Sequence, residues 1–188
     1  MRKLTSMTTL ATLTAACLMV SGVLVRAADT ENGKNEQRGQ LSRKDYKFVR
    51  EAAEGGMLEV RLGELAKQKG STPAVQQFGD QMVKDHTKAN DELKALAEKK
   101  GAGIPTQLGR KEENEIERLQ KLAGNDFDKS YAEHMVKDHK KDVKEFQDAA
   151  KGAEDAELKA FAEKTLPILE HHSQMAQEME SSVKQAQP

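Results

Sequence analysis

Residues 72–101 read TPAVQQFGDQMVKDHTKANDELKALAEKKG, and this stretch decides the fold. Its apolar side chains recur every three or four residues, which is typical of one face of an amphipathic α-helix. Thr72 suits the N-cap, Pro73 suits the first helical position, and Gly101 ends the pattern. The apolar face also carries a histidine, and it consists of Val75, Phe78, Met82, His86, Ala89, Leu93 and Leu96.

Three other long segments have the same spacing, at about 43–69, 126–152 and 155–183. We expect Asn125 or Asp126 to cap the second of these and Pro167 to kink the third. Four long helices without strand-type alternation predict an all-α fold. The predicted architecture is an antiparallel four-helix bundle with a short extra helix before the third long helix.

The first 27 residues are typical of a secretory signal peptide: a basic start, an apolar run over 10–25 and a cleavage site with small residues. We expect cleavage after Ala27; an uncleaved anchor is the alternative, because the apolar run is nearly long enough to span a bilayer. The mature chain would then hold a flexible tether at 28–42, the helical domain at 43–184 and a tail at 185–188. This predicts a periplasmic or otherwise exported protein of the cell envelope, with no stable membrane span after cleavage.

The composition argues against several functional classes. The chain has 30 basic and 31 acidic residues, and the signal holds only basic ones, so the exported part is acidic overall. Because the chain has no Trp and its composition gives no basic surface, we expect no nucleic-acid binding. The single cysteine, Cys17, lies in the signal, which leaves no thiol chemistry. No nucleophile motif or phosphate-binding loop is present, so we expect no enzyme activity.

A five-residue string, Met-Val-Lys-Asp-His, occurs at 82–86 and again at 135–139. At 100° per residue, the histidine of each copy lies on the inner face of its helix. His172 lies near the centre of the last helix's apolar face, whereas His171 points away from it. The first helix offers Glu59 on the flank of its own apolar face. Imidazole and carboxylate groups are ligands of transition metal ions. The candidate metal ligands are therefore Glu59, His86, His139 and His172.

Two interpretations of these residues remain open. In the first, the histidines are ordinary core residues hydrogen-bonded to buried carboxylates such as Asp142. In the second, they bind a metal ion. A ferritin-type di-iron site needs Glu three residues before a histidine, and none of the five histidines has one. Met82, Met135 and Met175 lie one helical turn from the inward histidines, and thioether with imidazole would suit copper.

The chain resembles the bacterial domain-of-unknown-function family 4142, over roughly 43–183. The similarity rests on several motifs: Asp45-x-x-Phe48, residues 56–66, Val75-x-x-Phe78, residues 82–90, Phe127-Asp128-x-x-Tyr131, residues 158–162 and Leu166-Pro167 with His172. It implies an exported, ferritin-like helical bundle associated with the cell envelope, without an established activity. The missing iron motif means that the ferritin-like grouping does not imply iron storage.

Two functions are compatible with these patterns. One is a non-enzymatic envelope protein, related to stress, whose charged outer helix faces contact a protein partner or a second copy of the chain. The other is a periplasmic bundle that binds copper or another transition metal ion through its inward histidines. A raised melting temperature on addition of metal would favour the second, because an ion that binds only the folded state stabilises it.

Overall fold

The computed structural model describes residues 37–185, so the predicted signal peptide at 1–27 lies outside the described part. The described residues contain no strand, and five α-helices lie wholly within them, which confirms the all-α prediction. None of these helices is long and apolar enough to cross a membrane. They are α2 (Arg43–Lys69), α3 (Pro73–Lys99), α4 (Arg110–Gln120), α5 (Gly124–Gly152) and α6 (Ala156–Gln185).

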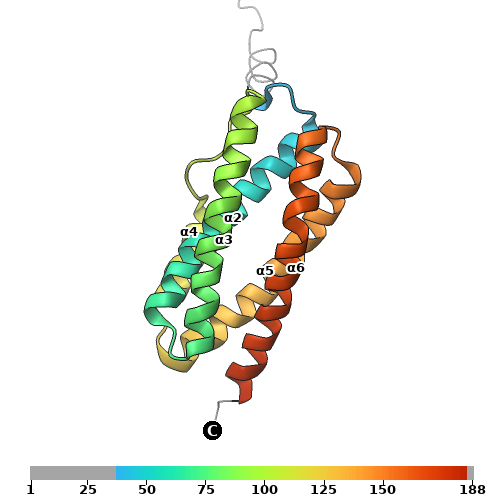
Figure 1. Ribbon diagram of the computed structural model, residues 1–188. Coiled ribbons are helices and arrows are strands. Elements are labelled where there is room, and N and C mark those ends of the chain that lie inside the picture. Colours follow the sequence, from blue (N-terminus) through green and yellow to red (C-terminus); the bar gives the residue numbers. More distant parts are fainter. Residues whose placement is uncertain (1–36, 186–188) are drawn as a thin grey trace, which may run out of the picture.

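The four long helices lie side by side, as Figure 1 shows. The most extensive packing is between α2 and α3 and between α5 and α6, which are neighbours in the chain. Further contacts join α3 to α6 and α2 to α5, and the short α4 lies against α2 and α5. The inward faces of all four long helices therefore meet in one interior.

One of the two predicted N-caps is present in the structure. Thr72 caps α3 through its side chain, with Pro73 in the first position, and Asp155 accepts hydrogen bonds from the backbone at the start of α6. The predicted cap of α5 is wrong: α5 begins at Gly124, and no side chain caps it. Asn125 and Asp126 lie in its first turn instead. The last helix, α6, continues through the exposed Pro167.

Two buried aspartates connect helices to distant loops. Asp45, near the start of α2, accepts hydrogen bonds of 2.8–3.1 Å from the backbone N–H groups of Glu154 and Asp155, just before α6. Asp128 in α5 accepts bonds of 2.8–3.0 Å from Ser71 and Thr72, between α2 and α3. Buried carboxylates that accept several N–H groups are strong attachments. These bonds connect the α2–α3 pair to the α5–α6 pair.

The apolar core has two parts that meet at the middle of the helices. The first apolar cluster includes Phe78, Met82, Tyr131 and Met135, and the second apolar cluster includes Phe48, Leu93, Phe146 and Phe161. On α3 and α5, a histidine follows the first cluster and precedes the second along the chain. The inward histidines of α3 and α5 therefore lie between two apolar layers.

Candidate metal centre

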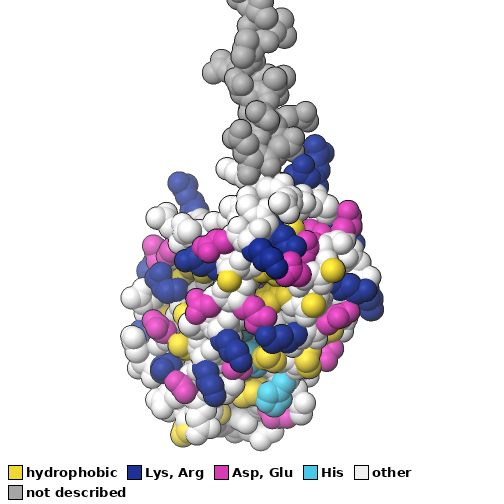
Figure 2. All heavy atoms as spheres, turned by 45° about the horizontal axis from the view of Figure 1, so that its top comes forward, with side chains coloured by type: hydrophobic (Ala, Val, Ile, Leu, Met, Phe, Trp, Pro, Cys, Tyr) yellow, Lys and Arg dark blue, Asp and Glu magenta, His cyan; other side chains and the backbone are white. Residues whose placement is uncertain are grey.

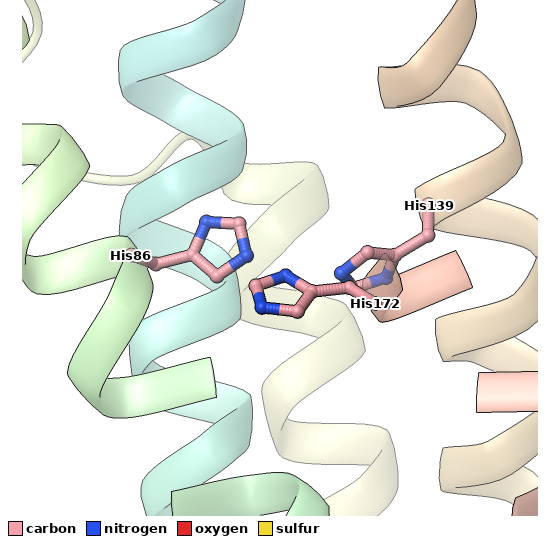
Figure 3. A group of neighbouring side chains, drawn as sticks. All are labelled: His86, His139 and His172. Carbon is pink, nitrogen blue, oxygen red and sulfur yellow. The ribbon is translucent and has the colours of Figure 1, made fainter. Parts of the chain in front are cut away.

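The structure brings the three inward histidines together. His86 comes from α3, His139 from α5 and His172 from α6, and Figure 3 shows their rings gathered between these helices. The ring centroids lie 5.8, 5.5 and 5.3 Å apart, which makes a nearly equilateral triangle. One nitrogen from each ring lies within 4.8 Å of the other two. His86, His139 and His172 are called the site histidines below.

One nitrogen of each site histidine is hydrogen-bonded or paired with an oxygen. His139 Nδ1 donates to the backbone carbonyl of Met135 at 3.0 Å, and His172 Nε2 donates to Asp85 Oδ2 at 2.8 Å. His86 Nδ1 lies 2.8 Å from Glu59 Oε2. Such outer partners are typical of metal-binding histidines, because they fix the ring orientation and the position of the proton.

The other nitrogen of each site histidine is buried and has no hydrogen-bond partner. These atoms are His86 Nε2, His139 Nε2 and His172 Nδ1. When the first nitrogen carries the proton, the second holds a lone pair, which is the form that binds a metal ion. A buried polar atom without a partner is costly in a core, so three of them in one place point to a ligand.

Burial keeps the site histidines neutral. It lowers the pKa of His86 to about 4 and of His139 to about 3. The pKa of His172 also falls, to about 4, because burial outweighs the hydrogen bond to Asp85. Protons therefore do not compete with a metal ion for these nitrogens at neutral pH.

Glu59, from α2, faces two of the site histidines. Its Oε2 contacts His86, and its Oε1 lies 3.2 Å from His139 Nε2 without the geometry of a hydrogen bond. Two ligands of one tetrahedral ion with bonds of about 2.0–2.1 Å lie about 3.3 Å apart. The distance between Oε1 and Nε2 is thus close to that between two ligands of one ion.

Two more acidic side chains extend the centre on α5. Asp138 and Asp142 each place a carboxylate oxygen within 4.8 Å of one from Glu59. Burial raises the pKa of Glu59 well above its ordinary value, and Asp138 raises it further. Burial likewise raises the pKa of Asp142, with Glu59 as a further cause. This group of oxygens would carry a larger negative charge once a cation was bound beside it.

Besides Asp138, the sequence analysis missed Asp85 as a residue of the site. It lies to the side of the apolar face of α3, yet its carboxylate reaches His172 on α6. Burial opposes its ionisation, but the hydrogen bonds from Gln81 and His172 outweigh that effect and lower its pKa. The sequence signal that could have identified Asp85 is its position directly before the inward histidine in the repeated Met-Val-Lys-Asp-His string.

The two other histidines are not part of the group formed by the site histidines. His171 is exposed, as predicted, and His134 contacts Glu115 of α4 at 2.9 Å. Of the three methionines predicted as soft donors, Met82 and Met135 pack in the first apolar cluster and Met175 packs against it. The polar groups that converge at the centre are therefore imidazole nitrogens and carboxylate oxygens.

Comparison with solved structures identifies the fold. The crystal structure of a DUF305 fragment from Deinococcus radiodurans matches with a TM-score of 0.65 and covers 77% of this chain and 98% of that chain. Its sequence identity is 11%, so the likeness concerns the fold alone. No curated protein matches the chain significantly.

Comparison with protein families confirms the resemblance drawn from the motifs. The sequence model of DUF4142, a domain of unknown function, matches residues 30–179. The match includes α2 to α5, nearly all of α6, and every residue of the candidate metal centre. This protein therefore belongs to the DUF4142 family.

Proposed function

We propose that this protein binds a transition metal ion through His86, His139 and His172, with Glu59 at the same centre. The observation that carries the proposal is the convergence of three buried imidazole nitrogens that have no hydrogen-bond partner. Histidines with a purely structural role would use both nitrogens or leave one in water. Here each ring is fixed through one nitrogen and presents the other to its neighbours.

The donor set favours zinc or copper among the common ions. Neutral imidazole suits both, and each accepts a carboxylate oxygen as a further ligand. Glu59 Oε1, buried and without a partner, is the fourth donor that we propose. The absence of a Glu-x-x-His motif argues against the di-iron chemistry of ferritins. Binding of the ion would release the proton that burial favours on Glu59.

The setting that we propose is an exported, non-enzymatic protein of the cell envelope, with a role in metal binding or stress. Support comes from the signal-like residues 1–27 and from the lack of a nucleophile motif. We further interpret the packing of α2, α3, α5 and α6 as an antiparallel four-helix bundle of the ferritin-like type. In such a bundle, each helix contributes one side chain to a shared centre.

The test is metal binding by residues 28–188, prepared without metal and titrated with Zn²⁺ and Cu²⁺ by calorimetry. We expect one ion per chain, with affinity lowered at least a hundredfold in His86→Ala and His139→Ala. The matched control is His171→Ala, because this histidine is exposed and adjacent to His172 in sequence. Equal affinity in the control and the site variants would show that the ion binds elsewhere.

A further inference from the structure

A hollow of about 100 Å³ reaches the candidate metal centre from the side of the bundle. Its wall includes three buried residues of the centre, His86, His172 and Glu59. The exposed side chains of Lys164 and Ile168 line its outer end. Figure 2 shows histidine atoms (cyan) set back between charged side chains on the surface of this protein. A water molecule needs about 10–15 Å³ of such space, so the hollow has room for several.

The other directions from the site histidines are more tightly filled. Along the bundle, the first apolar cluster lies on one side, and the second apolar cluster lies on the other and contributes Phe146 and Phe161 to the wall of the hollow. Across the bundle, α2 packs extensively against α3, and α5 against α6. The hollow lies where α3 faces α6, and these helices belong to different pairs with less extensive packing. A second hollow, where α2 faces α5, is lined by residues such as Lys44 and Lys141 and by none of the proposed ligands.

The lining of the first hollow suits a cation. Four carboxylates line it against two lysines, one of which is paired with a carboxylate. Asp85 lies between the surface and the core: its side chain is 23% exposed, and its Oδ2 lies 2.8 Å from Nε2 of the buried His172. Carboxylate oxygens bind divalent cations, so Asp85 offers an incoming ion a contact directly beside one of the proposed ligands. The four carboxylates are those of Glu59, Asp85, Glu92 and Asp142.

An ion pair between α3 and α6 lies across the outer end of this hollow. Lys164 Nζ on α6 lies 2.7 and 2.8 Å from the two carboxylate oxygens of Glu92 on α3. The two side chains are 57% and 39% exposed, and exposed ion pairs contribute little to stability. The Lys164–Glu92 pair can therefore open without disturbing the helices that it connects.

Gly55 on α2 keeps the hollow wide. A Cβ atom at Gly55 would meet no other atom within 4 Å, so no close helix packing requires glycine there. The neighbouring Gly56 differs, because its Cβ would lie 2.0 Å from Asn90 Oδ1. A larger side chain at Gly55 would therefore extend into the hollow and narrow it.

We infer that this hollow is the passage through which the metal ion enters and leaves the centre, and that the Lys164–Glu92 pair closes it. The inference rests on the proposed function, since a passage needs an ion that binds at its inner end. A passage sets the height of the barrier between the free and the bound ion, but not the free energies of these two states. Changes to it should therefore alter the association and dissociation rate constants by the same factor and leave Kd unchanged.

Stopped-flow mixing of the metal-free protein with Co²⁺, followed by the absorbance of the bound ion, tests this inference. Mixing the loaded protein with excess chelator gives the dissociation rate constant. We expect Lys164→Gln and Glu92→Gln each to raise both rate constants at least threefold, because each breaks the pair. A pure effect of charge would instead change Co²⁺ uptake in opposite directions in these two variants. Gly55→Leu should lower both rate constants at least tenfold, and Kd should stay within a factor of three in every variant.

Two matched controls accompany these variants. Lys67→Gln breaks the 2.7 Å contact with Asp80, which connects α2 to α3 away from the hollow, and it should bind Co²⁺ at the rate of the wild type. Glu64→Leu adds a leucine at an exposed position of α2 and should also leave both rate constants unchanged. Gly55→Ala provides a milder variant that keeps the test valid if Gly55→Leu does not fold, with rate constants lowered at least twofold.

The outcomes separate this inference from the proposed function. If Co²⁺ binds to the site histidines but the Gly55 variants bind and release it at wild-type rates, the passage is overturned. Wild-type rates in the two glutamine variants, or changes in opposite directions, would overturn the closure by the Lys164–Glu92 pair. If Co²⁺ does not bind to the site histidines, both the passage and the proposed function are overturned.

Discussion

Replacing His139 with leucine should stabilise the metal-free protein while abolishing metal binding. His139 is fully buried, and its Nε2 has no hydrogen-bond partner. In the metal-free state this nitrogen has lost water without gaining another partner. Leucine has a similar volume and no polar atom, so it removes the penalty. The substitution also removes a metal ligand. It should therefore raise the stability of the metal-free protein and lower the stability of the protein in the presence of metal, relative to the wild type.

The size of the effect follows from the contacts of His139. An unpartnered buried polar atom costs about 1–3 kcal/mol, and a typical hydrogen bond contributes about 0.5–1.5 kcal/mol. The bond lost is that from Nδ1 to the carbonyl of Met135, which lies within α5. We therefore expect a net gain of about 1 kcal/mol, or roughly 2–4 °C in melting temperature. Metal at a hundred times its Kd should raise wild-type stability by about 2.7 kcal/mol, but not that of the variant.

Urea unfolding and thermal melting, each with chelator and with excess Zn²⁺, measure both effects. The two proteins should change order: His139→Leu is the more stable without metal, and the wild type is the more stable with it. His171→Leu is the control, because this histidine is exposed and its replacement should leave both values near those of the wild type. A loss of 1 kcal/mol or more in metal-free His139→Leu, with an unchanged urea m-value, would refute the reasoning.

Three further predictions concern the surroundings of the centre. Asp85→Asn weakens the orientation of His172, so metal affinity should fall about 10–100-fold; calorimetry should show no such fall in the exposed control Asp91→Asn. The site histidines have folded pKa values of about 4, 3 and 4, against about 6.5 when unfolded, so the unfolded state takes up their protons first as pH falls. The contribution of the site histidines therefore lowers the stability of the metal-free protein as pH falls from about 6.5 towards 4, whereas the raised carboxyl pKa values have the opposite effect. Because His139→Leu lacks one of these histidines, its stability should fall less steeply with decreasing pH than that of the wild type. Parallel curves of stability against pH would contradict this. Asp45→Ala leaves two backbone N–H groups without their acceptor and should cost about 2–4 kcal/mol in urea unfolding, whereas a cost below about 0.5 kcal/mol would show that water replaces the carboxylate.

Helix positions and inward faces were largely predictable from the sequence. The spacing of apolar residues gave α2 with the bounds found in the structure and identified His172, not His171, as the buried one. The start of α5 was not predictable from capping residues, because Gly124 begins that helix without a side-chain cap. Local propensity decides a helix end only weakly when tertiary packing fixes it.

The convergence of the candidate centre could not be derived from one sequence. Periodicity gives the direction of a side chain around its helix, but not the height at which four helices meet. His86 and His139 were predicted to point inward, and only the structure shows one ring nitrogen of each within 4.8 Å of the other. The contribution of Asp85 was missed for a related reason, because its carboxylate reaches sideways from the edge of α3 to α6.

The division of the candidate ligands between two helix pairs has a consequence for folding. Glu59 and His86 belong to α2 and α3, whereas His139 and His172 belong to α5 and α6. Neither half of the chain contains three of the four donors, so a high-affinity site would form only when the halves dock. The absorbance of bound Co²⁺ or Cu²⁺, measured during refolding, would then report when the two halves dock. In this protein the arrival of the ion would mark the completion of the chain's long-range assembly.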